Sequence, residues 1–227
     1  RADGVGDGHV APARRLHESG NAQAGIADQL DNIGTTMKEA RDDIVQIRSI
    51  LDDLAIESRY IHCDAALCGG YAAFLDPPPA WDFEDGADSI AISGHKFLGS
   101  PIPCGIALAR RAHVERIGHS VAYIGSVDTT ISGSRNGLTP LILWYAIRSL
   151  GLEGMRERTG HALQTAAYAE EQFISAGMKA WRNPQALTVV FPQPPATVRE
   201  KWQLASAGGS SHLICMPHVR PEQIDEL

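Results

Sequence analysis

The sequence predicts a layered α/β protein that carries a small α+β domain at its carboxyl end. Three observations lead to this prediction. Short apolar segments and a helical pattern are joined by Gly-rich turns over the first 110 residues, which is typical of a sheet covered by helices. Two helical patterns follow. Strand and helix patterns then alternate over short distances near the end of the chain.

The first elements are predicted from apolar spacing. Residues 1–30 show neither a helical nor a strand period, so we expect an irregular segment there. Apolar residues at spacings of three and four then predict a helix that begins after Ala40: Ile44, Ile47, Leu51 and Leu54. Its first turn is expected to hold three acidic residues: Glu39, Asp42 and Asp43. Three short buried strands are expected at 60–64, 89–92 and 105–109, with a Pro-rich surface loop at 76–80.

Helical patterns dominate after residue 110. Pro140 opens an apolar helix that Gly151 can close, and Trp144 and Tyr145 on it are expected in the core. A second helix is expected over 155–177, ended by Gly177, with five residues facing inward: Leu163, Ala166, Ala167, Phe173 and Ile174. The remaining elements are a strand at 186–191, a helix at 197–206, a strand at 211–217 and a helix starting in the last seven residues.

The composition limits the function. The 227 residues carry 20 Lys and Arg against 27 Asp and Glu, a formal charge of −7, so we do not expect a nucleic-acid partner. No apolar run approaches the roughly 20 residues that span a bilayer, and no secretory signal is visible. The four cysteines form no CxxC pair, which favours buried, reduced thiols in a cytoplasmic protein. The nine histidines show no HxxxH or HExxH pair, so no metal site is expected.

Two chemically suggestive residues each follow a short predicted strand. Lys96 stands beside His95 and is flanked by glycines, a setting that can lower the pKa of an amine and make it nucleophilic toward an aldehyde. The alternative is a lysine that simply reaches solvent. Asp64 ends an apolar strand, where a carboxylate needs a partner or caps a helix. Together, Asp64 and Lys96 suggest a pyridoxal phosphate site, with the aspartate holding the pyridine nitrogen protonated.

Several motifs in order carry a resemblance to a known family. They are NIGTTM (32–37), HCDAALCGG (62–70), SIAISGHKFLGSPIPCG (89–105), TISGSRNG (130–137), LWYAIRSLG (143–151) and VREKWQLA (198–205). Residues 31–227 thereby resemble the group II pyridoxal-phosphate-dependent amino-acid decarboxylases, most closely the branch that contains bacterial histidine decarboxylase and plant serine decarboxylase. The resemblance implies a partial large domain of the fold-type I transferase kind over 31–154. A linking helix and small domain would follow over 155–227.

The resemblance also implies roles for individual residues. Lys96 would carry pyridoxal 5'-phosphate through its amine, Asp64 would bond the pyridinium nitrogen, and Ala66 would lie against the ring face. Ser93 and His95 resemble residues that hold the phosphate or order the lysine, so His95 joins Lys96 and Asp64 among the expected catalytic residues. Either Thr35 or Thr36 would lie near the ring oxygen of the cofactor. The segment 133–137 would lie near the active site and reach a partner subunit.

The implied reaction is decarboxylation of an L-amino acid, first of all histidine to histamine and CO2, in a homodimer. Serine or another amino acid is the alternative substrate. An aminotransferase or a desulfurase of the same fold is a further reading, because Arg135 could bind a substrate carboxylate.

The sequence also departs from the family. Family members are longer at the amino-terminal side, so the resemblance implies an N-terminally truncated, interior piece of a longer chain. The absent part would supply a ring-stacking residue, phosphate contacts and part of the substrate pocket. The strand expected before NIGTT reads GIADQLD, and Asp28, Gln29 and Asp31 predict a damaged sheet edge with an exposed apolar face. An inactive remnant that serves only as a binding or dimerisation module is therefore the competing hypothesis.

Overall fold

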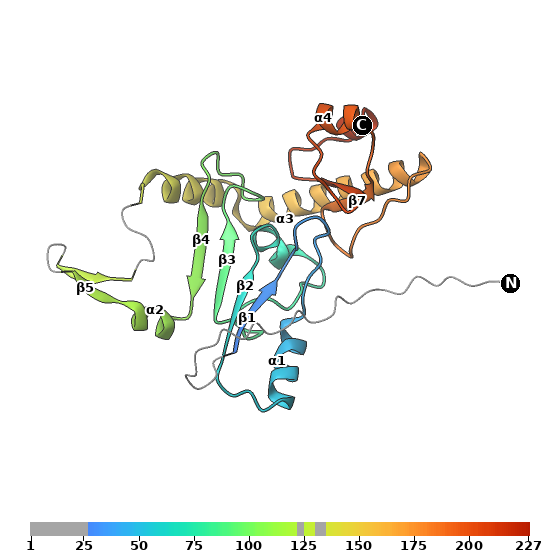
Figure 1. Cartoon of the computed structure of the whole chain (residues 1–227). Helices are drawn as coiled ribbons and strands as arrows, with labels where there is room; N and C mark the ends of the chain where they lie inside the picture. Colours follow the sequence, from blue (N-terminus) through green and yellow to red (C-terminus); the bar gives the residue numbers. More distant parts are fainter. Residues whose placement is uncertain (1–26, 122–124, 130–134) are drawn as a thin grey trace.

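A computed structural model describes residues 27–121, 125–129 and 135–227 (Figure 1). Its strands are β1 (Ala27–Asn32), β2 (Arg59–Asp64), β3 (Ser89–Ser93), β4 (Gly105–Ala109), β5 (His119–Val121), β6 (Ser126–Asp128), β7 (Thr188–Pro192), β8 (Ser206–Ala207) and β9 (Ser210–Ile214). Its α-helices are α1 (Ile44–Asp53), α2 (Arg111–Ile117), α3 (Leu138–Ser175), α4 (Ala196–Trp202) and α5 (Pro221–Asp225). Two short 3-10 helices, Cys68–Gly70 and Ala72–Phe74, follow β2.

A four-stranded sheet forms the centre of the molecule, in the order β1-β2-β3-β4 (Figure 1). Strands β1, β2 and β3 run parallel, and β4 pairs antiparallel with β3. The parallel strands therefore end at one edge, and the loops that follow them meet there. The α/β class and the three strands predicted at 60–64, 89–92 and 105–109 are confirmed.

Strand β1 corrects two expectations. Residues 27–30 were expected in an irregular segment, and three polar residues were expected to damage the strand before NIGTT. Instead, Ala27–Asn32 pairs with all six residues of β2. The strand tolerates Asp31 because its carboxyl group, although fully buried, accepts a hydrogen bond from the Cys63 thiol at 3.2 Å. Residues 1–26 lie outside the described part of the chain.

Helix α1 confirms the predicted helix but not its acidic first turn. The helix begins at Ile44, and Ile44 and Leu51 are buried as expected. Asp43 is its N-cap, and its side chain accepts a hydrogen bond from the Gln46 amide. Asp42 and Glu39 lie before the helix. Their side chains accept hydrogen bonds from backbone amides elsewhere in the fold. The predicted end at Leu54 is the exposed C-cap.

Helix α3 contains both predicted helices, separated at Gly151. The backbone there has φ 62° and ψ −173°, which only glycine adopts readily. In the second half, Ala166 and Phe173 are buried and Leu163 is partly buried, whereas Ala167 and Ile174 are exposed. Alanines and threonines complete the buried face of this half: Thr159, Ala162, Thr165 and Ala169. The prediction missed them because it relied mainly on large apolar side chains.

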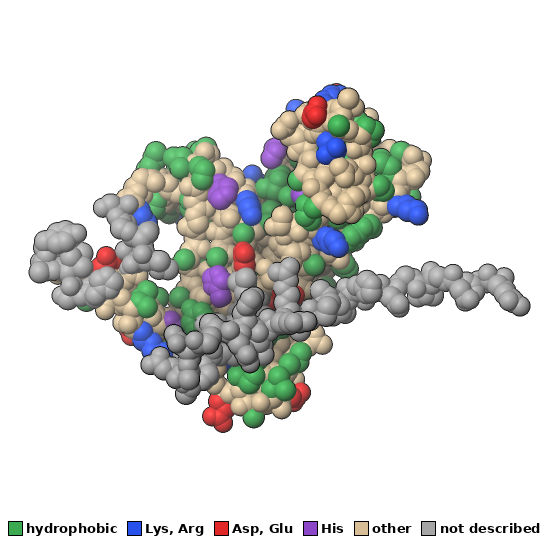
Figure 2. Space-filling view, viewed as in Figure 1, with side chains coloured by type: hydrophobic (Ala, Val, Ile, Leu, Met, Phe, Trp, Pro, Cys, Tyr) green, Lys and Arg blue, Asp and Glu red, His purple; other side chains and the backbone are tan. Residues whose placement is uncertain are grey.

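Two apolar segments expected to be buried are exposed. Trp144 and Tyr145 were expected in the core, but 59% and 68% of their surfaces are accessible. Strand β4 was also expected to be buried, but it is mostly exposed and lies at the edge of the sheet. Figure 2 shows apolar side chains gathered along the first half of α3.

The carboxyl-terminal elements form a second core. Strand β7 pairs with β9, and β9 pairs with β8. Helices α3 and α5 contact each other, and α3 also contacts β7. The predicted helix at 197–206 ends at Trp202, since Gln203 adopts a left-handed conformation and residues 206–207 form β8. The predicted strands at 186–191 and 211–217 and the terminal helix are confirmed with small shifts.

Within the described residues, no helix combines the length and the apolar character that crossing a bilayer requires.

Candidate functional site

The expected site residues follow the carboxyl ends of three neighbouring parallel strands. Thr35 and Thr36 follow β1, Asp64 ends β2, and Lys96 follows β3. The strands hold these positions in register: Asn32 pairs with Asp64, and Asp64 pairs with Ala91. Polar groups at such an edge of an open parallel sheet form the usual place for a ligand in this class of fold.

Asp64 is half-buried at the end of β2. Its Oδ1 accepts a hydrogen bond from the Ala66 amide at 3.1 Å, which fixes the carboxylate above the start of the next turn. The backbone of Ala66 is bound in turn, because its carbonyl accepts from the Ser93 amide at 3.0 Å. Two hydrogen bonds through Ala66 therefore link Asp64 to Ser93 at this edge of the sheet.

Lys96 is exposed on the turn after β3. Its side chain forms no hydrogen bond or ion pair within the described residues. His95 is also exposed, and its Nδ1 lies 2.9 Å from the Cys104 carbonyl and 3.1 Å from the Cys104 amide nitrogen. These contacts hold the His95 ring against the start of β4. His95 therefore orders the turn that carries Lys96.

The turn that carries Lys96 is anchored by its neighbour Phe97. Phe97 is fully buried, and its ring centroid lies 5.0 Å from that of Tyr71. A Cβ on Gly70 would lie 2.8 Å from the Cβ of Phe97, so a glycine is needed for this close approach. Gly70 thus lets the chain after Asp64 pack directly against the turn that carries Lys96.

Loop 34–40 holds the two threonines. Thr35 is half-buried, and its Oγ1 accepts from the Ala40 amide at 3.1 Å, whereas Thr36 is exposed. The amides of Gly34 and Thr35 both donate to the Ala40 carbonyl. Thr35 is thus the more firmly held of the two candidates.

Sequence reasoning missed Glu39 as part of this region. It placed Glu39 in the first turn of α1, whereas the side chain is fully buried beside Tyr71 and the segment before β7. No spacing or motif in the sequence signals this placement. The buried position of a carboxyl group between distant segments is visible only in the fold.

The segment 133–137 is only partly described, since residues 130–134 lie outside the described residues. Asn136 Oδ1 accepts hydrogen bonds from the amide and the hydroxyl of Thr139 at 2.9 and 2.8 Å. These bonds hold Asn136 against the first turn of α3, which begins at Leu138. A role of this segment near the active site stays a prediction.

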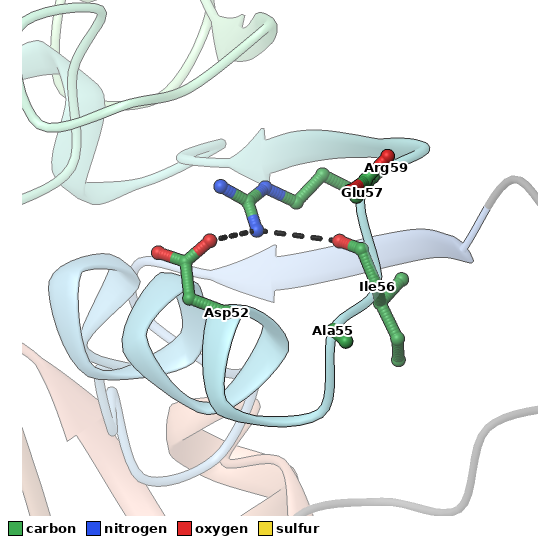
Figure 3. Close-up of a pocket in the computed structure, with 5 residues that line it drawn as sticks. All are labelled: Asp52, Ala55, Ile56, Glu57 and Arg59. Carbon is green, nitrogen blue, oxygen red and sulfur yellow. Dashed lines mark hydrogen bonds and ion pairs between the residues drawn. The ribbon is translucent and has the colours of Figure 1, made fainter.

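A surface hollow of about 470 Å³ lies at the other end of β2 (Figure 3). It is lined by Asp52, Ala55, Ile56, Glu57 and Arg59. Arg59 begins β2 and Asp64 ends it, so about 16 Å of extended chain separates the hollow from the candidate site. An ion pair at 2.5 Å joins Arg59 to Asp52 across the hollow. The hollow therefore belongs to the connection between helix α1 and strand β2.

The residues of the candidate site fit pyridoxal phosphate. An unpartnered, exposed amine on Lys96 can react with an aldehyde, and the carboxylate of Asp64 can pair with a cationic ring nitrogen. Ala66 leaves space for a planar ring because its side chain is a single methyl group. Ser93, His95 and Thr35 supply hydrogen-bonding side chains that can hold a phosphate or a ring oxygen.

Comparison with known proteins identifies the family that the chain resembles. A family model described as the pyridoxal-dependent decarboxylase conserved domain matches residues 25–184. A histidine decarboxylase of Mesorhizobium japonicum is 53% identical over 196 residues, which cover 86% of this chain and 53% of that protein. A histidine decarboxylase of Acinetobacter baumannii is 51% identical over 86% of this chain and 52% of that protein.

Solved structures show the same fold. L-methionine decarboxylase from Streptomyces sp. 590 is similar with a TM-score of 0.78 and 29% identity, over 88% of this chain and 52% of that chain. Glutamate decarboxylase from Lactobacillus brevis has a TM-score of 0.74 at 18% identity, which is evidence for the fold alone. The chain spans about half the length of the curated relatives that it matches.

Proposed function

Because the chain belongs to the pyridoxal-dependent decarboxylase family, we propose that it serves the pyridoxal-phosphate-dependent decarboxylation of L-histidine to histamine and CO2. The observation that carries the proposal is the placement of Asp64 and Lys96 after neighbouring parallel strands, inside the matched segment. The histidine decarboxylases at about half identity support histidine as the substrate. Serine is the alternative substrate.

Each site residue has a role in this proposal. The amine of Lys96 would hold the cofactor and leave it free to react with a substrate amine. The carboxylate of Asp64 keeps a proton on the ring nitrogen, and its bond to the Ala66 amide keeps it oriented. When bound, the cofactor supplies an electron sink for the electrons left by CO2. Ser93, His95 and either Thr35 or Thr36 hold its polar substituents.

We propose three further properties with the same reaction. The protein is a homodimer, which the exposed apolar side chains of α3 support. It is cytoplasmic, which its four unpaired cysteines support. Its chain divides into a partial cofactor-binding domain over 31–154 and a linking helix with a small domain over 155–227. A cluster of buried apolar residues that lies wholly within 155–227 supports this division, although Met155, Ala162 and Leu187 pack into the other cluster.

The first test is a titration of the purified chain with pyridoxal phosphate, followed by the visible absorbance of the lysine-bound cofactor. We expect a saturable band that Lys96→Ala removes and that the control Lys179→Ala, on an exposed residue, retains. Borohydride reduction and peptide mapping should then place the label on Lys96. A band that survives in Lys96→Ala would overturn the assignment of this lysine.

The second test measures CO2 release from histidine, serine and aromatic amino acids. Faster turnover of histidine than of serine supports the proposed substrate, and the reverse order supports the alternative. A chain without a cofactor band and without CO2 release would contradict the proposed activity. It would favour the competing hypothesis of a binding or dimerisation module.

A further inference from the structure

Glu39 is a fully buried carboxylate between three distant parts of the chain. Both of its oxygens lie 3.1 Å from the amide nitrogen of Leu187, and Oε2 accepts from the Thr188 hydroxyl at 2.5 Å. Leu187 and Thr188 stand at the start of β7, nearly 150 residues away in the sequence. The carboxylate therefore ties the loop before α1 to the carboxyl-terminal sheet.

Further contacts of the Glu39 carboxylate come from the segment after Asp64 and from Arg41. The hydroxyl of Tyr71 donates to Oε1, and the thiol of Cys68 lies 3.6 Å from the same oxygen. Burial, followed by the charge of Glu39, raises the pKa of Tyr71, so this phenol remains a donor. Arg41 supplies a cation at 3.9 Å and donates to the Gln185 carbonyl at 2.9 Å.

The backbone of Glu39 belongs to the loop that presents Thr35. Its amide donates to the Thr35 carbonyl at 2.8 Å, inside the set of bonds that joins Gly34, Thr35 and Ala40. Glu39 has a left-handed φ of 51°, a conformation that costs a non-glycine residue energy. The contacts of its carboxylate with β7 offset this cost and hold loop 34–40 in shape.

We propose that Glu39 is a positioning residue. The contact between its side chain and the start of β7 keeps loop 34–40 ordered. The loop carries Thr35 and Thr36, so the consequence for cofactor binding rests on the proposed function. The dependence itself is a property of the chain without cofactor. A change in β7 that leaves the loop untouched should therefore loosen the loop.

Thr188→Val is the decisive variant, because it removes one hydroxyl from β7 and keeps the side-chain shape. Glu39→Gln is its partner on the loop. The matched control is Glu170→Gln, which breaks the 2.9 Å ion pair with Arg182 in the carboxyl-terminal part and touches no residue of the loop. Amide hydrogen exchange of Gly34, Thr35, Glu39 and Ala40 is measured without cofactor, and global unfolding is measured by urea titration.

We expect Thr188→Val and Glu39→Gln each to speed exchange of the loop amides by about five- to tenfold, beyond any change in global stability. The double variant should speed loop exchange by less than the product of the two single effects, because Glu39 and Thr188 share one contact. Glu170→Gln should change loop exchange only as much as it changes global unfolding. Unchanged loop exchange in Thr188→Val, or equal effects in all three variants, would overturn the proposal.

A second readout separates this inference from the proposed function. If the wild-type chain binds pyridoxal phosphate, Thr188→Val should weaken binding several-fold, and Glu170→Gln should not. A wild-type chain that fails to bind contradicts the proposed function, while the exchange measurement still decides the role of Glu39. Equal cofactor affinity in Thr188→Val and wild type, with faster loop exchange, would limit the role of Glu39 to the loop and overturn its role in the cofactor site.

Discussion

Asp31 is a carboxyl group enclosed in the core where β1 meets β2. Burial is the main cause that raises its pKa from 3.8 to about 7, and the charges of Asp42 and Asp43 act in the same direction. The hydrogen bond from Cys63 acts the other way, and Oδ1 has no partner in the described part of the structure. The Asp31 carboxyl group is therefore mainly protonated at mildly acidic pH and about half protonated near pH 7.

This raised pKa predicts a stability that falls as pH rises. Between about pH 4 and pH 7 the unfolded chain loses the Asp31 proton while the folded chain retains it, so the free energy of unfolding decreases. Asp31→Asn removes the titration. The free energy of unfolding of Asp31→Asn should exceed that of wild type by near zero at pH 4 and by on the order of 4 kcal/mol above pH 7. Urea unfolding at several pH values without cofactor measures this difference.

The control for this prediction is Asp53→Asn, on an exposed residue at the end of α1. Differences between each variant and wild type remove the contributions of all other titrating groups. A difference in the free energy of unfolding between Asp31→Asn and wild type that stays constant with pH would contradict the prediction. It would show that the pKa of Asp31 is the same in the folded and the unfolded chain.

Asp64 is expected to separate cofactor binding from catalysis. Asp64→Asn keeps the side-chain shape and an oxygen for the Ala66 amide, but it cannot hold a proton on a ring nitrogen. We expect the band of the lysine-bound cofactor to persist while CO2 release falls by about 10²–10³-fold. Absorbance and CO2 release measured on the same sample check both parts. Asp64→Asn with wild-type turnover would remove Asp64 from the mechanism.

At the scale of elements, the break in α3 predicts opposite effects for two glycines of one helix. Gly151 has a backbone that strains any other residue, although a Cβ there would meet no atom within 4 Å. Gly151→Ala should therefore lower the free energy of unfolding by about 1–3 kcal/mol. Gly160→Ala should raise it by about 0.5–1 kcal/mol, because this position is helical and open. Urea unfolding measures both, and stabilisation by Gly151→Ala would indicate a continuous helix.

The elements show how far the sequence determines the fold. Local patterns predicted β2, β3 and β4 because short apolar runs between turns need no distant partner to be recognised. They predicted β4 as buried, because apolar content does not reveal which strand lies at an edge. Asp64 and Lys96 were predictable from their neighbours in the chain. Glu39 was not, because its partners Leu187 and Thr188 are distant in sequence.

At the scale of the molecule, the first half of α3 has no partner in the described structure for much of its apolar surface. Its large exposed apolar residues are Leu138, Leu141, Trp144, Tyr145 and Ile147, and exposed Leu152 directly follows the break at Gly151. A continuous patch of this kind usually marks an interface. The chain spans about half the length of its relatives, and the proposed homodimer needs a surface of this character.

This surface predicts self-association that single charges can weaken. Leu141→Arg and Tyr145→Arg change exposed side chains, so each should alter the free energy of unfolding by no more than about 0.5 kcal/mol. Each should nevertheless weaken association about tenfold or more, because an interface centre disfavours an unpaired charge. Sedimentation velocity over a range of concentrations measures the association. Ile50→Lys, on the exposed face of α1, is the control and should sediment like wild type. Equal association of all three variants would place the contact between copies elsewhere on the molecule.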